Sequence, residues 1–297
     1  MNILIVGQSV VDKIIDEESV SVKPGGIFYA VVSMLSQAVT EDNIYLCSSI
    51  DKQNDKLFKP AYSKIKNDFL VYVDSIPQVE LKVDGICERK ETYSRIAANL
   101  PLPKENLNQF DGILINMISG FDISLNQLEQ LKKNYSGLVY FDVHTFSRGV
   151  DKNLNRIFRR IADFNEWAEC IDILQANESE LLTLSDREEE AAIVDELFSY
   201  GIKQIIITRA ERGATVFFRE NDSIRKIHKD ALQVKVSNKV GCGDVFGAVY
   251  FYNYIKNKNV LLTLEQANLF AGIATTYSEA KDFLNLKSDA NERISKK

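Results

Sequence analysis

Residues 238–247 read NKVGCGDVFG and open an amphipathic stretch that extends to residue 256, directly after a β-prone run over residues 232–236. A Gly-x-Gly turn at the start of a helix leaves backbone N–H groups without intrahelical partners and pointing outward. The helix dipole adds partial positive charge there, so the turn is suited to binding a phosphate. Gly241 and Gly243 allow the backbone to approach such an anion closely.

Asp244 follows this turn directly. A carboxylate here would repel a bound phosphate, so its presence suggests a functional role. It is well placed to accept a proton from an attacking hydroxyl, as the general base of a phosphoryl transfer does. The alternative interpretation is structural, because an acid in the first turn of a helix is stabilised by the dipole. The motif alone favours the structural interpretation, so the choice between the two depends on features elsewhere in the chain.

Short apolar runs alternate with longer amphipathic stretches along the chain. The runs predict strands buried on both faces, at residues 3–6, 113–115, 138–141, 171–174 and 205–207. The amphipathic stretches predict helices, at residues 28–37, 125–135, 154–163, 188–200, 245–256 and 264–280. Strand, helix and strand at this spacing indicate βαβ units, and therefore an α/β fold with a mainly parallel central sheet.

Two segments depart from the alternation. Residues 10–24 and 69–98 contain β-prone runs without an intervening helix. They predict either a local extension of the main sheet or a small separate sheet that forms a lid over a ligand. The pattern favours neither interpretation. Because no linker, repeat or low-complexity tract divides the chain, we expect residues 1–297 to form a single domain.

The composition narrows the class of protein. Of the 297 residues, 45% are hydrophobic and 26% charged, which is an ordinary globular balance, and the formal charge of -6 argues against a nucleic-acid partner. No run approaches the ~20 apolar residues that cross a bilayer, so no membrane partner is expected. Four cysteines without a CxxC pair are typical of reduced thiols in a cytoplasmic protein: Cys47, Cys87, Cys170 and Cys242.

Polar residues follow several predicted strands, at the edge of a parallel sheet where ligands bind. Asn177 and Glu180 can organise a hydrated Mg²⁺ beside phosphates or form a helix capping box, and both can hold at once. Asp12 can accept hydrogen bonds from two hydroxyls of a polyol, or it is a solvated loop acid. Asn116 is a candidate contact to the acceptor, and His144 either faces the site or is packed away.

In their order and spacing these segments resemble the ribokinase-like (PfkB-type) carbohydrate kinase family across almost the whole chain. Gly25-Gly26 matches the family's di-glycine hinge, and Asn177 with Glu180 matches its N-x-x-E magnesium motif. Its anion hole and catalytic base, G-A-G-D, resemble Gly241-Cys242-Gly243-Asp244. Its nucleotide-binding strand and turn are similar to residues 205–208 and 211–214, and Asn268 falls where the family often lines the adenine pocket.

The resemblance implies a three-layer α/β/α fold with a small β lid, and an ATP-dependent kinase that phosphorylates a hydroxyl of a sugar or sugar-like substrate. It implies that Asp244 is the base, that the amides of Gly241, Cys242 and Gly243 form the anion hole, and that Glu180 positions Mg²⁺ largely through water. ATP contacts are implied for Asn177, Thr208, Gly213 and Asn268, and acceptor contacts for Asp12, Gly25, Gly26 and Asn116. In this family the lid is often a homodimer contact, and some members require a monovalent cation.

Several positions differ from the family pattern. Asn238-Lys239 stands where D-T is usual, Ala30 where an asparagine is common, and Arg209-Ala210 where a glycine pair continues the nucleotide-binding strand. Two other functions therefore stay open: a nucleoside kinase, and a non-catalytic regulatory module that binds a sugar or nucleotide. A dinucleotide-binding oxidoreductase is excluded, because the first strand is not followed by a G-x-G-x-x-G turn.

Overall fold

The computed structural model describes residues 1–15, 20–82, 90–221 and 223–295, with Cys87 outside these ranges. Within them, nine strands form a large sheet in the order β15-β14-β13-β12-β9-β8-β1-β4-β5. Neighbours from β5 to β13 run parallel, and β14 and β15 are antiparallel additions at one edge. The strands are β1 (Asn2–Val6), β4 (Asn43–Ile50), β5 (Lys66–Tyr72), β8 (Gly112–Asn116), β9 (Leu138–Asp142), β12 (Ile173–Asn177), β13 (Gln204–Thr208), β14 (Ala214–Glu220) and β15 (Ser223–Lys229).

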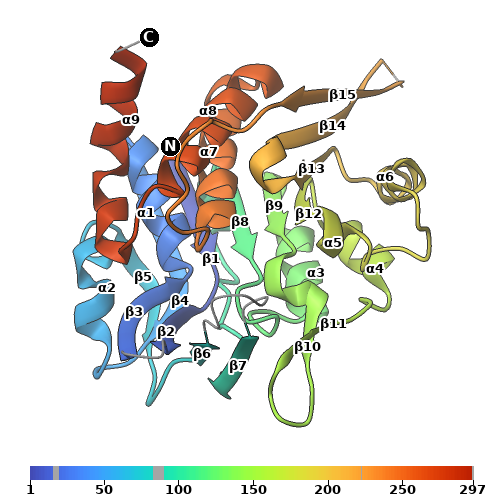
Figure 1. Cartoon of the computed structure of the whole chain (residues 1–297). Helices are drawn as coiled ribbons and strands as arrows, with labels where there is room; N and C mark the ends of the chain where they lie inside the picture. Colours follow the sequence, from blue (N-terminus) through green and yellow to red (C-terminus); the bar gives the residue numbers. More distant parts are fainter. Residues whose placement is uncertain (16–19, 83–89, 222, 296–297) are drawn as a thin grey trace.

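Helices cover both faces of the large sheet (Figure 1). One face packs against α1 (Phe28–Gln37), α2 (Asp55–Tyr62), α7 (Cys242–Asn257), α8 (Val260–Ala274) and α9 (Leu286–Ser295). The other packs against α3 (Leu125–Asn134), α4 (Phe164–Ala168), α5 (Glu178–Leu181) and α6 (Glu190–Ser199). Along β1, Ile3 and Ile5 enter the first core, and Leu4 and Val6 enter the second. Alternate side chains of one apolar run thus serve two cores, as a sheet covered on both faces requires.

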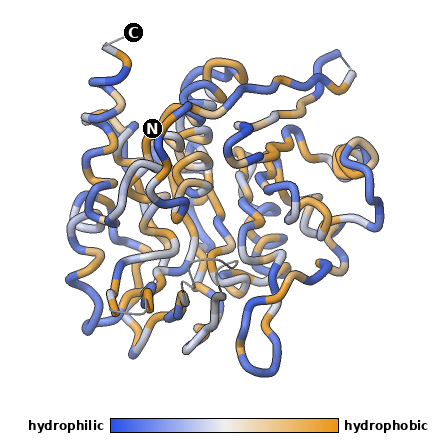
Figure 2. Tube along the Cα trace, in the orientation of Figure 1, coloured by the Kyte–Doolittle hydropathy of each residue, from blue (hydrophilic) through white to orange (hydrophobic). Residues whose placement is uncertain are grey.

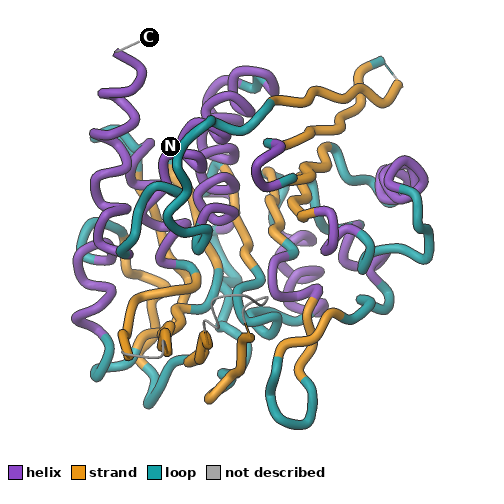
Figure 3. The backbone as a smooth tube through the Cα atoms, viewed as in Figure 1, coloured by secondary structure: helices purple, strands orange, loops and turns teal. Residues whose placement is uncertain are grey.

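Four strands form a second sheet apart from the large one (Figure 3). This small sheet has the order β3-β2-β6-β7 and contains β2 (Ser9–Ile15), β3 (Val20–Gly26), β6 (Gln78–Lys82) and β7 (Lys90–Arg95). It takes residues from both predicted β segments. Residues 69–72, at the start of the second segment, belong instead to β5 and pair with β4 in the large sheet.

One predicted helix, over residues 154–163, is wrong. The chain forms a hairpin there from β10 (Arg148–Val150) and β11 (Arg156–Phe158), and Leu154 adopts a positive φ of 63° that ends any helical path. The 148–158 hairpin lies against β7, through a bridge between Thr92 and Asn155 and a 3.0 Å hydrogen bond from the Tyr93 amide to the Leu154 carbonyl. Pairing with a distant strand has overridden a helix-like spacing of apolar residues.

Smaller differences concern boundaries. Residues 232–236, expected as a strand, follow β15 as irregular chain, and the last predicted helix begins earlier and ends earlier, as α8. Hydrophobic positions concentrate along the central strands and the helices that cover them, whereas the outer loops are hydrophilic (Figure 2). None of the helices in the described ranges combines the length and apolar character that a membrane span needs.

Candidate active site

A cavity of about 470 Å³ lies between the carboxyl ends of the parallel strands, the small sheet and the 148–158 hairpin. The predicted site residues line it, apart from Gly25 and Asn116. Those that do are Asp12, Gly26, Asn177, Glu180, Thr208, Gly213, Gly241, Cys242, Gly243, Asp244 and Asn268. The structure therefore brings together, in one cavity, residues that are spread over some 250 positions of the sequence.

Asp244 lies in the first turn of α7 and is 5% exposed. The side-chain amide Nδ2 of Asn116, at the end of β8, donates to Asp244 Oδ1 at 2.6 Å. Although Asn116 is not a wall of the cavity, this contact makes it part of the site. Its Oδ1 is buried and has no hydrogen-bond partner among the described residues.

Burial raises the pKa of Asp244 to about 7, and the negative charges of Asp12 and Glu180 act in the same direction. The hydrogen bond from Asn116 and the backbone N–H of Asp244 itself act against the rise. A carboxyl with a pKa near neutrality is a stronger base than an ordinary aspartate, and it is still ionised in part at pH 7. This environment favours the catalytic over the purely structural interpretation of Asp244.

The turn before Asp244 has the shape of an anion cradle. Gly241 has a φ of 77°, and a Cβ at this position would lie 2.5 Å from the ring of Tyr29. The space beside Gly243 is open, with the nearest atom to a Cβ there at 3.9 Å. Burial raises the pKa of the Cys242 thiol to about 12, so the thiol is neutral, and the Cys242 backbone amide donates to the Lys239 carbonyl at 3.4 Å.

Gln175 supports this turn from the middle of β12. Its Nε2 donates to the Gly243 carbonyl at 3.1 Å and to Asp142 Oδ2 at 2.9 Å, and its Oε1 accepts from the hydroxyl of Tyr140. Gln175 was missed in the sequence, although a polar residue inside an otherwise apolar strand marks such a position. It joins the start of α7 to the end of β9.

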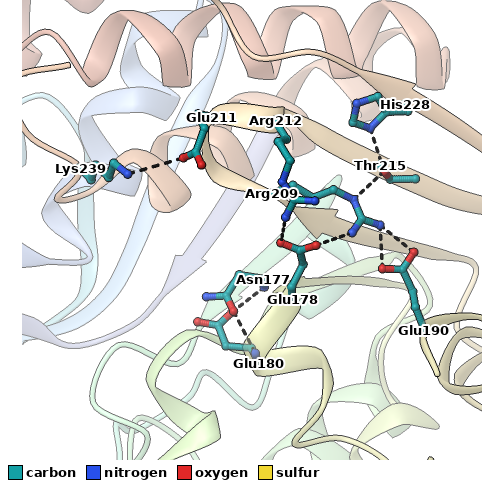
Figure 4. Close-up of polar contacts among 10 residues, drawn as sticks. All are labelled: Asn177, Glu178, Glu180, Glu190, Arg209, Glu211, Arg212, Thr215, His228 and Lys239. Carbon is teal, nitrogen blue, oxygen red and sulfur yellow. Dashed lines mark hydrogen bonds and ion pairs between the residues drawn. The ribbon is translucent and has the colours of Figure 1, made fainter. Parts of the chain in front are cut away.

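Asn177 and Glu180 form a capping box (Figure 4). This was one of the two interpretations of these residues from the sequence. Asn177 Oδ1 accepts from the Glu180 amide at 2.9 Å, and Glu180 Oε2 accepts from the Asn177 amide at 2.8 Å. Burial raises the pKa of Glu180 to about 7, against the hydrogen bond from Asn177 and the positive charge of Arg148. Glu180 also lines the cavity, so the cap does not remove it from the site.

A cluster of acids faces the same space. Ligand atoms of Asp142, His144 and Asp244 lie within 4.8 Å of one another. Burial, followed by the charges of Glu180 and Asp244, raises the pKa of Asp142 well above its ordinary value. Burial is the largest cause of the raised pKa values of Asp142, Glu180 and Asp244. Carboxylate oxygens are the ligands that Mg²⁺ prefers, so this donor set fits a divalent cation of that kind.

Gly25 has an indirect place in the site. A Cβ on Gly25 would collide with the carboxyl group of Asp12, so the glycine leaves the room that this side chain occupies. At the other end of the cavity, a Cβ on Gly213 would collide with the carbonyl of Lys229. Asn268 donates from Nδ2 to that carbonyl at 2.9 Å and fixes the chain that leaves β15.

Comparison of the sequence with known proteins finds a family model that matches part of the chain. A family model described as pfkB family carbohydrate kinase matches residues 145–286. The deoxyribokinase of Salmonella typhi is 27% identical over 157 residues, which make up 50% of this chain and 48% of that protein. The chain thus spans about half the length of the curated relative that it matches.

Comparison with solved structures identifies the fold. The ribokinase of Arabidopsis thaliana, complexed with ribose and ATP, has a TM-score of 0.74 at 16% identity and covers 96% of this chain and 98% of its own. A nucleoside kinase of Methanocaldococcus jannaschii, an archaeal member of the ribokinase family, has a TM-score of 0.73 at 17% identity and covers 100% and 98%. Residues 145–286 thus resemble the pfkB family, and the whole chain has the fold of a ribokinase. The predicted ribokinase-like three-layer fold is confirmed.

The chain differs from the pattern of the pfkB family at Arg209, where a glycine was expected. Its guanidinium binds Glu190 with Nη2 and Glu178 with Nη1, at 2.7 and 2.8 Å, and its Nε donates to Thr215 at 3.0 Å (Figure 4). The next residue, Ala210, adopts a positive φ of 51°, which favours the glycine that it replaces. Arg209 therefore links the end of β13 to α5 and α6 through these contacts.

The second difference from that pattern, Lys239, lies at the mouth of the cavity. Its Nζ approaches Glu211 at 3.7 Å (Figure 4). Both side chains are largely exposed, so the pair contributes little to stability and is free to exchange partners. Arg148 and Arg156 of the 148–158 hairpin also line the cavity. They were not predicted, because the sequence pattern assigned their segment in part to a helix.

Proposed function

We propose that this protein is a kinase of the pfkB type, which transfers the γ-phosphate of ATP to a hydroxyl group of a sugar or sugar-like acceptor. The observation that carries the proposal is the position of Asp244: a buried carboxyl with a pKa of about 7, at the start of a helix whose first amides form an anion cradle, inside a cavity. The acceptor hydroxyl and the phosphoryl group would meet beside this residue.

In the proposed reaction, Asp244 accepts the proton of the attacking hydroxyl. Asn116 orients the carboxylate through its 2.6 Å hydrogen bond. The amides of Gly241, Cys242 and Gly243 donate to the migrating phosphoryl group, and the dipole of α7 favours the charge that develops there. A divalent cation would be held by Asp142 and His144 beside Asp244, with Glu180 of the cavity wall acting largely through water, and it would supply positive charge next to the phosphates.

The two ends of the cavity take the two substrates. At one end Asn177, Thr208, Gly213 and Asn268 surround the ATP, beside an apolar wall formed by Leu232, Val234, Val236 and Ala271. At the other end Asp12 and Gly26 of the small sheet contact the acceptor, and Gly25 leaves room for Asp12. The small sheet would close this end as a lid. A ribokinase of the same fold has been solved in complex with ribose and ATP, which supports a sugar and ATP as the two substrates.

The test is an assay of ATP consumption over a panel of sugars and nucleosides, with Mg²⁺ and with EDTA. The proposal expects turnover with one sugar class, loss of turnover in EDTA, and loss of turnover in Asp244→Asn. Replacing Na⁺ by K⁺ in the same assay reports any monovalent-cation requirement. If no acceptor is consumed while ATP and sugar both bind, the chain is a binding module and the proposal fails.

A nucleoside is the second candidate acceptor. Val10, Val79, Leu81 and Ile118 form an apolar wall at the acceptor end, which suits a base, and one protein of the same fold is a nucleoside kinase.

Two further parts of the proposal concern the whole protein. Exposed Val20 and Val22 on β3, at 60% and 50%, favour a homodimer through the small sheet, which light scattering would test. The free thiols of Cys47, Cys170 and Cys242 favour a reducing, cytoplasmic compartment.

A further inference from the structure

We infer that Gln175 is a positioning residue of the candidate active site, whose side-chain amide holds the carboxyl group of Asp142 and the peptide before Asp244 at the same time. It thereby sets how the proposed base lies relative to the proposed cation position. The inference deepens the proposed function and rests on it for the reaction. The placement of the two acids is testable without turnover.

Gln175 is a polar residue between two apolar ones in β12. β12 pairs with β9 in a register that sets Gln175 beside Asp142 and Ile173 beside Tyr140. Ile173 and Tyr140 are buried in the core that includes α7, and side chains two residues further along a strand point to the same face. Gln175 and Asp142 therefore lie on the α7 side of the sheet, and both line the cavity.

The two hydrogens of the Gln175 amide each have an acceptor. Nε2 donates to Asp142 Oδ2 at 2.9 Å and to the Gly243 carbonyl at 3.1 Å, while Oε1 accepts from the Tyr140 hydroxyl. The reverse orientation of the amide would set Oε1 against two oxygens, so these partners fix the orientation. Gln175 is 3% exposed, and its hydrogen bonds offset the cost of burying an amide.

The contact with Gly243 reaches Asp244 through one peptide plane. The Gly243 carbonyl and the Asp244 N–H belong to the same planar unit, so a donor that holds the carbonyl also directs the N–H. That N–H bonds to the carboxyl group of Asp244 and favours its ionised form. Gln175 therefore acts on the proposed base through the backbone.

The contact with Asp142 acts on the cation position. Ligand atoms of Asp142, His144 and Asp244 lie within 4.8 Å of one another, and Gln175 holds one carboxyl oxygen of Asp142. A hydrogen bond of this kind orients a metal-binding carboxylate, and its loss costs about 10- to 100-fold in metal affinity or activity. One amide thus holds an acid of the cation position and the peptide of the base in a single arrangement.

Gly247 leaves the room that this amide occupies. It lies in the interior of α7, where glycine is less favourable than alanine. A Cβ at Gly247 would lie 2.8 Å from Gln175 Oε1 and 3.2 Å from the Tyr140 hydroxyl oxygen. A glycine inside a helix and a glutamine inside an apolar strand are each unfavourable locally, and the position of the Gln175 side chain accounts for both.

The test compares Gln175→Met with Gln204→Met in the full chain. Methionine keeps the length of glutamine and removes its donors. Gln204 is the matched control, because it is 4% exposed, begins β13 at the end away from the cavity, and accepts at 2.8 Å from the hydroxyl of Tyr250 on α7. Both variants lose a buried hydrogen bond between glutamine and tyrosine, so both should lower the melting temperature.

Two measurements report the two contacts of Gln175. Binding of Mn²⁺ without substrate, followed by electron paramagnetic resonance, reports the cation position, because Mn²⁺ takes the same oxygen ligands as Mg²⁺. The kinase assay at saturating Mg²⁺ and ATP reports the base. For Gln175→Met we expect Mn²⁺ affinity and kcat each to fall by about 10- to 100-fold, with little change in the KM for ATP. Gln204→Met should match wild type in both.

Gly247→Ala is a second variant, which acts through Gln175. Gly247 is not among the described residues that line the cavity, and the added Cβ meets the end of a flexible side chain, so the amide moves aside and the fold is retained. We expect weaker Mn²⁺ binding and a lower kcat without a lower melting temperature, because alanine is the better helix former. If Gln175→Met does not fold, Gly247→Ala and Tyr140→Phe, which removes the donor to Oε1, replace it.

The outcomes separate this inference from the proposed function. Weaker Mn²⁺ binding by Gln175→Met and Gly247→Ala, with no phosphoryl transfer to any acceptor by the wild type, would support the placement of Asp142 by Gln175 and overturn the kinase. An active wild type, with the same kcat and Mn²⁺ affinity in Gln175→Met as in Gln204→Met, would overturn the positioning role and leave the kinase. A wild type that binds no Mn²⁺, or an active variant in which only one of the two quantities changes, also overturns the inference.

Discussion

Asn116 Nδ2 donates to Asp244 Oδ1 at 2.6 Å and thereby joins the end of a central strand to the first turn of α7. The bond fixes one oxygen of the carboxyl group and leaves the other for a substrate. It also favours the ionised form, against the effects of burial and of the neighbouring acids. The position and the protonation of the proposed base therefore depend in part on this amide.

Replacing Asn116 by leucine removes this donor at similar volume. Because the hydrogen bond lowers the pKa of Asp244, its loss should raise that pKa. The acidic limb of the pH profile of kcat should then move to higher pH. Asn43→Leu, at the opposite end of the large sheet, is the control and should leave the profile unchanged. An Asn116 variant with lower activity but an unshifted profile would contradict the role given to this bond.

Asp244→Asn should lower kcat by about 10²- to 10⁴-fold, the usual contribution of a general base, with little change in acceptor affinity. Asp55→Asn provides a matched control, because Asp55 also lies in the first turn of a helix but far from the cavity wall. Steady-state kinetics of the two variants decide the matter. Equal activity of Asp244→Asn and wild type would assign Asp244 to helix stabilisation alone.

The activity of the wild type should fall as the pH drops below about 7, since Asp244 must be ionised to accept a proton and its pKa lies near that value. The dependence should appear in kcat/KM measured from pH 5.5 to 8.5 at saturating ATP. An ordinary aspartate would give a flat profile over this range. A flat profile would mean that the base is another group or that substrate binding restores a low pKa.

The same shift has a consequence for stability. The pKa of Asp244 is higher in the folded chain than its ordinary value of 3.8, so its ionisation opposes folding. This destabilisation is absent at low pH, grows between about pH 4 and pH 7, and is complete above. Asp244→Asn removes it, so the melting temperature of the variant relative to wild type should be higher at pH 8 than at pH 5. A difference independent of pH would contradict the burial of an ionisable group here.

Gly241→Ala should abolish activity, because it adds a Cβ 2.5 Å from the Tyr29 ring at a positive φ. Gly201→Ala is the control: it has a φ of 101° but no atom within 4 Å of a Cβ, so it carries the backbone strain without the clash. We expect about 1 kcal/mol of lost stability and full activity for the control. Phosphate-analogue binding, measured beside activity, separates a damaged cradle from a damaged fold.

The central strands were predictable from sequence because they are buried on both faces, which makes their apolar runs continuous. The capping box of Asn177 and Glu180 was predictable for a different reason, since it is local in sequence. Asp244 and its glycines were found through their motif. These features share one property: each depends on residues close together in the chain.

The 148–158 hairpin could not be predicted in this way. Leu154, Ile157, Phe158 and Ile161 have the spacing of a helix face, yet Ile157 and Phe158 are each 48% exposed. The hairpin is determined by its contact with Thr92 and Tyr93, about sixty residues earlier. Arg148 and Arg156 went unnoticed for the same reason, because their meeting at the cavity depends on that contact.

The bridge between Thr92 and Asn155 also affects how the small sheet can meet other molecules. The chain's own hairpin occupies part of the outer edge of β7, whereas in the described ranges the outer edge of β3 has no strand beside it. Strand addition needs a row of outward-facing backbone groups, and these remain at β3. The sheet therefore has one open and one blocked side, a geometry that permits a closed pair of chains and opposes open-ended growth.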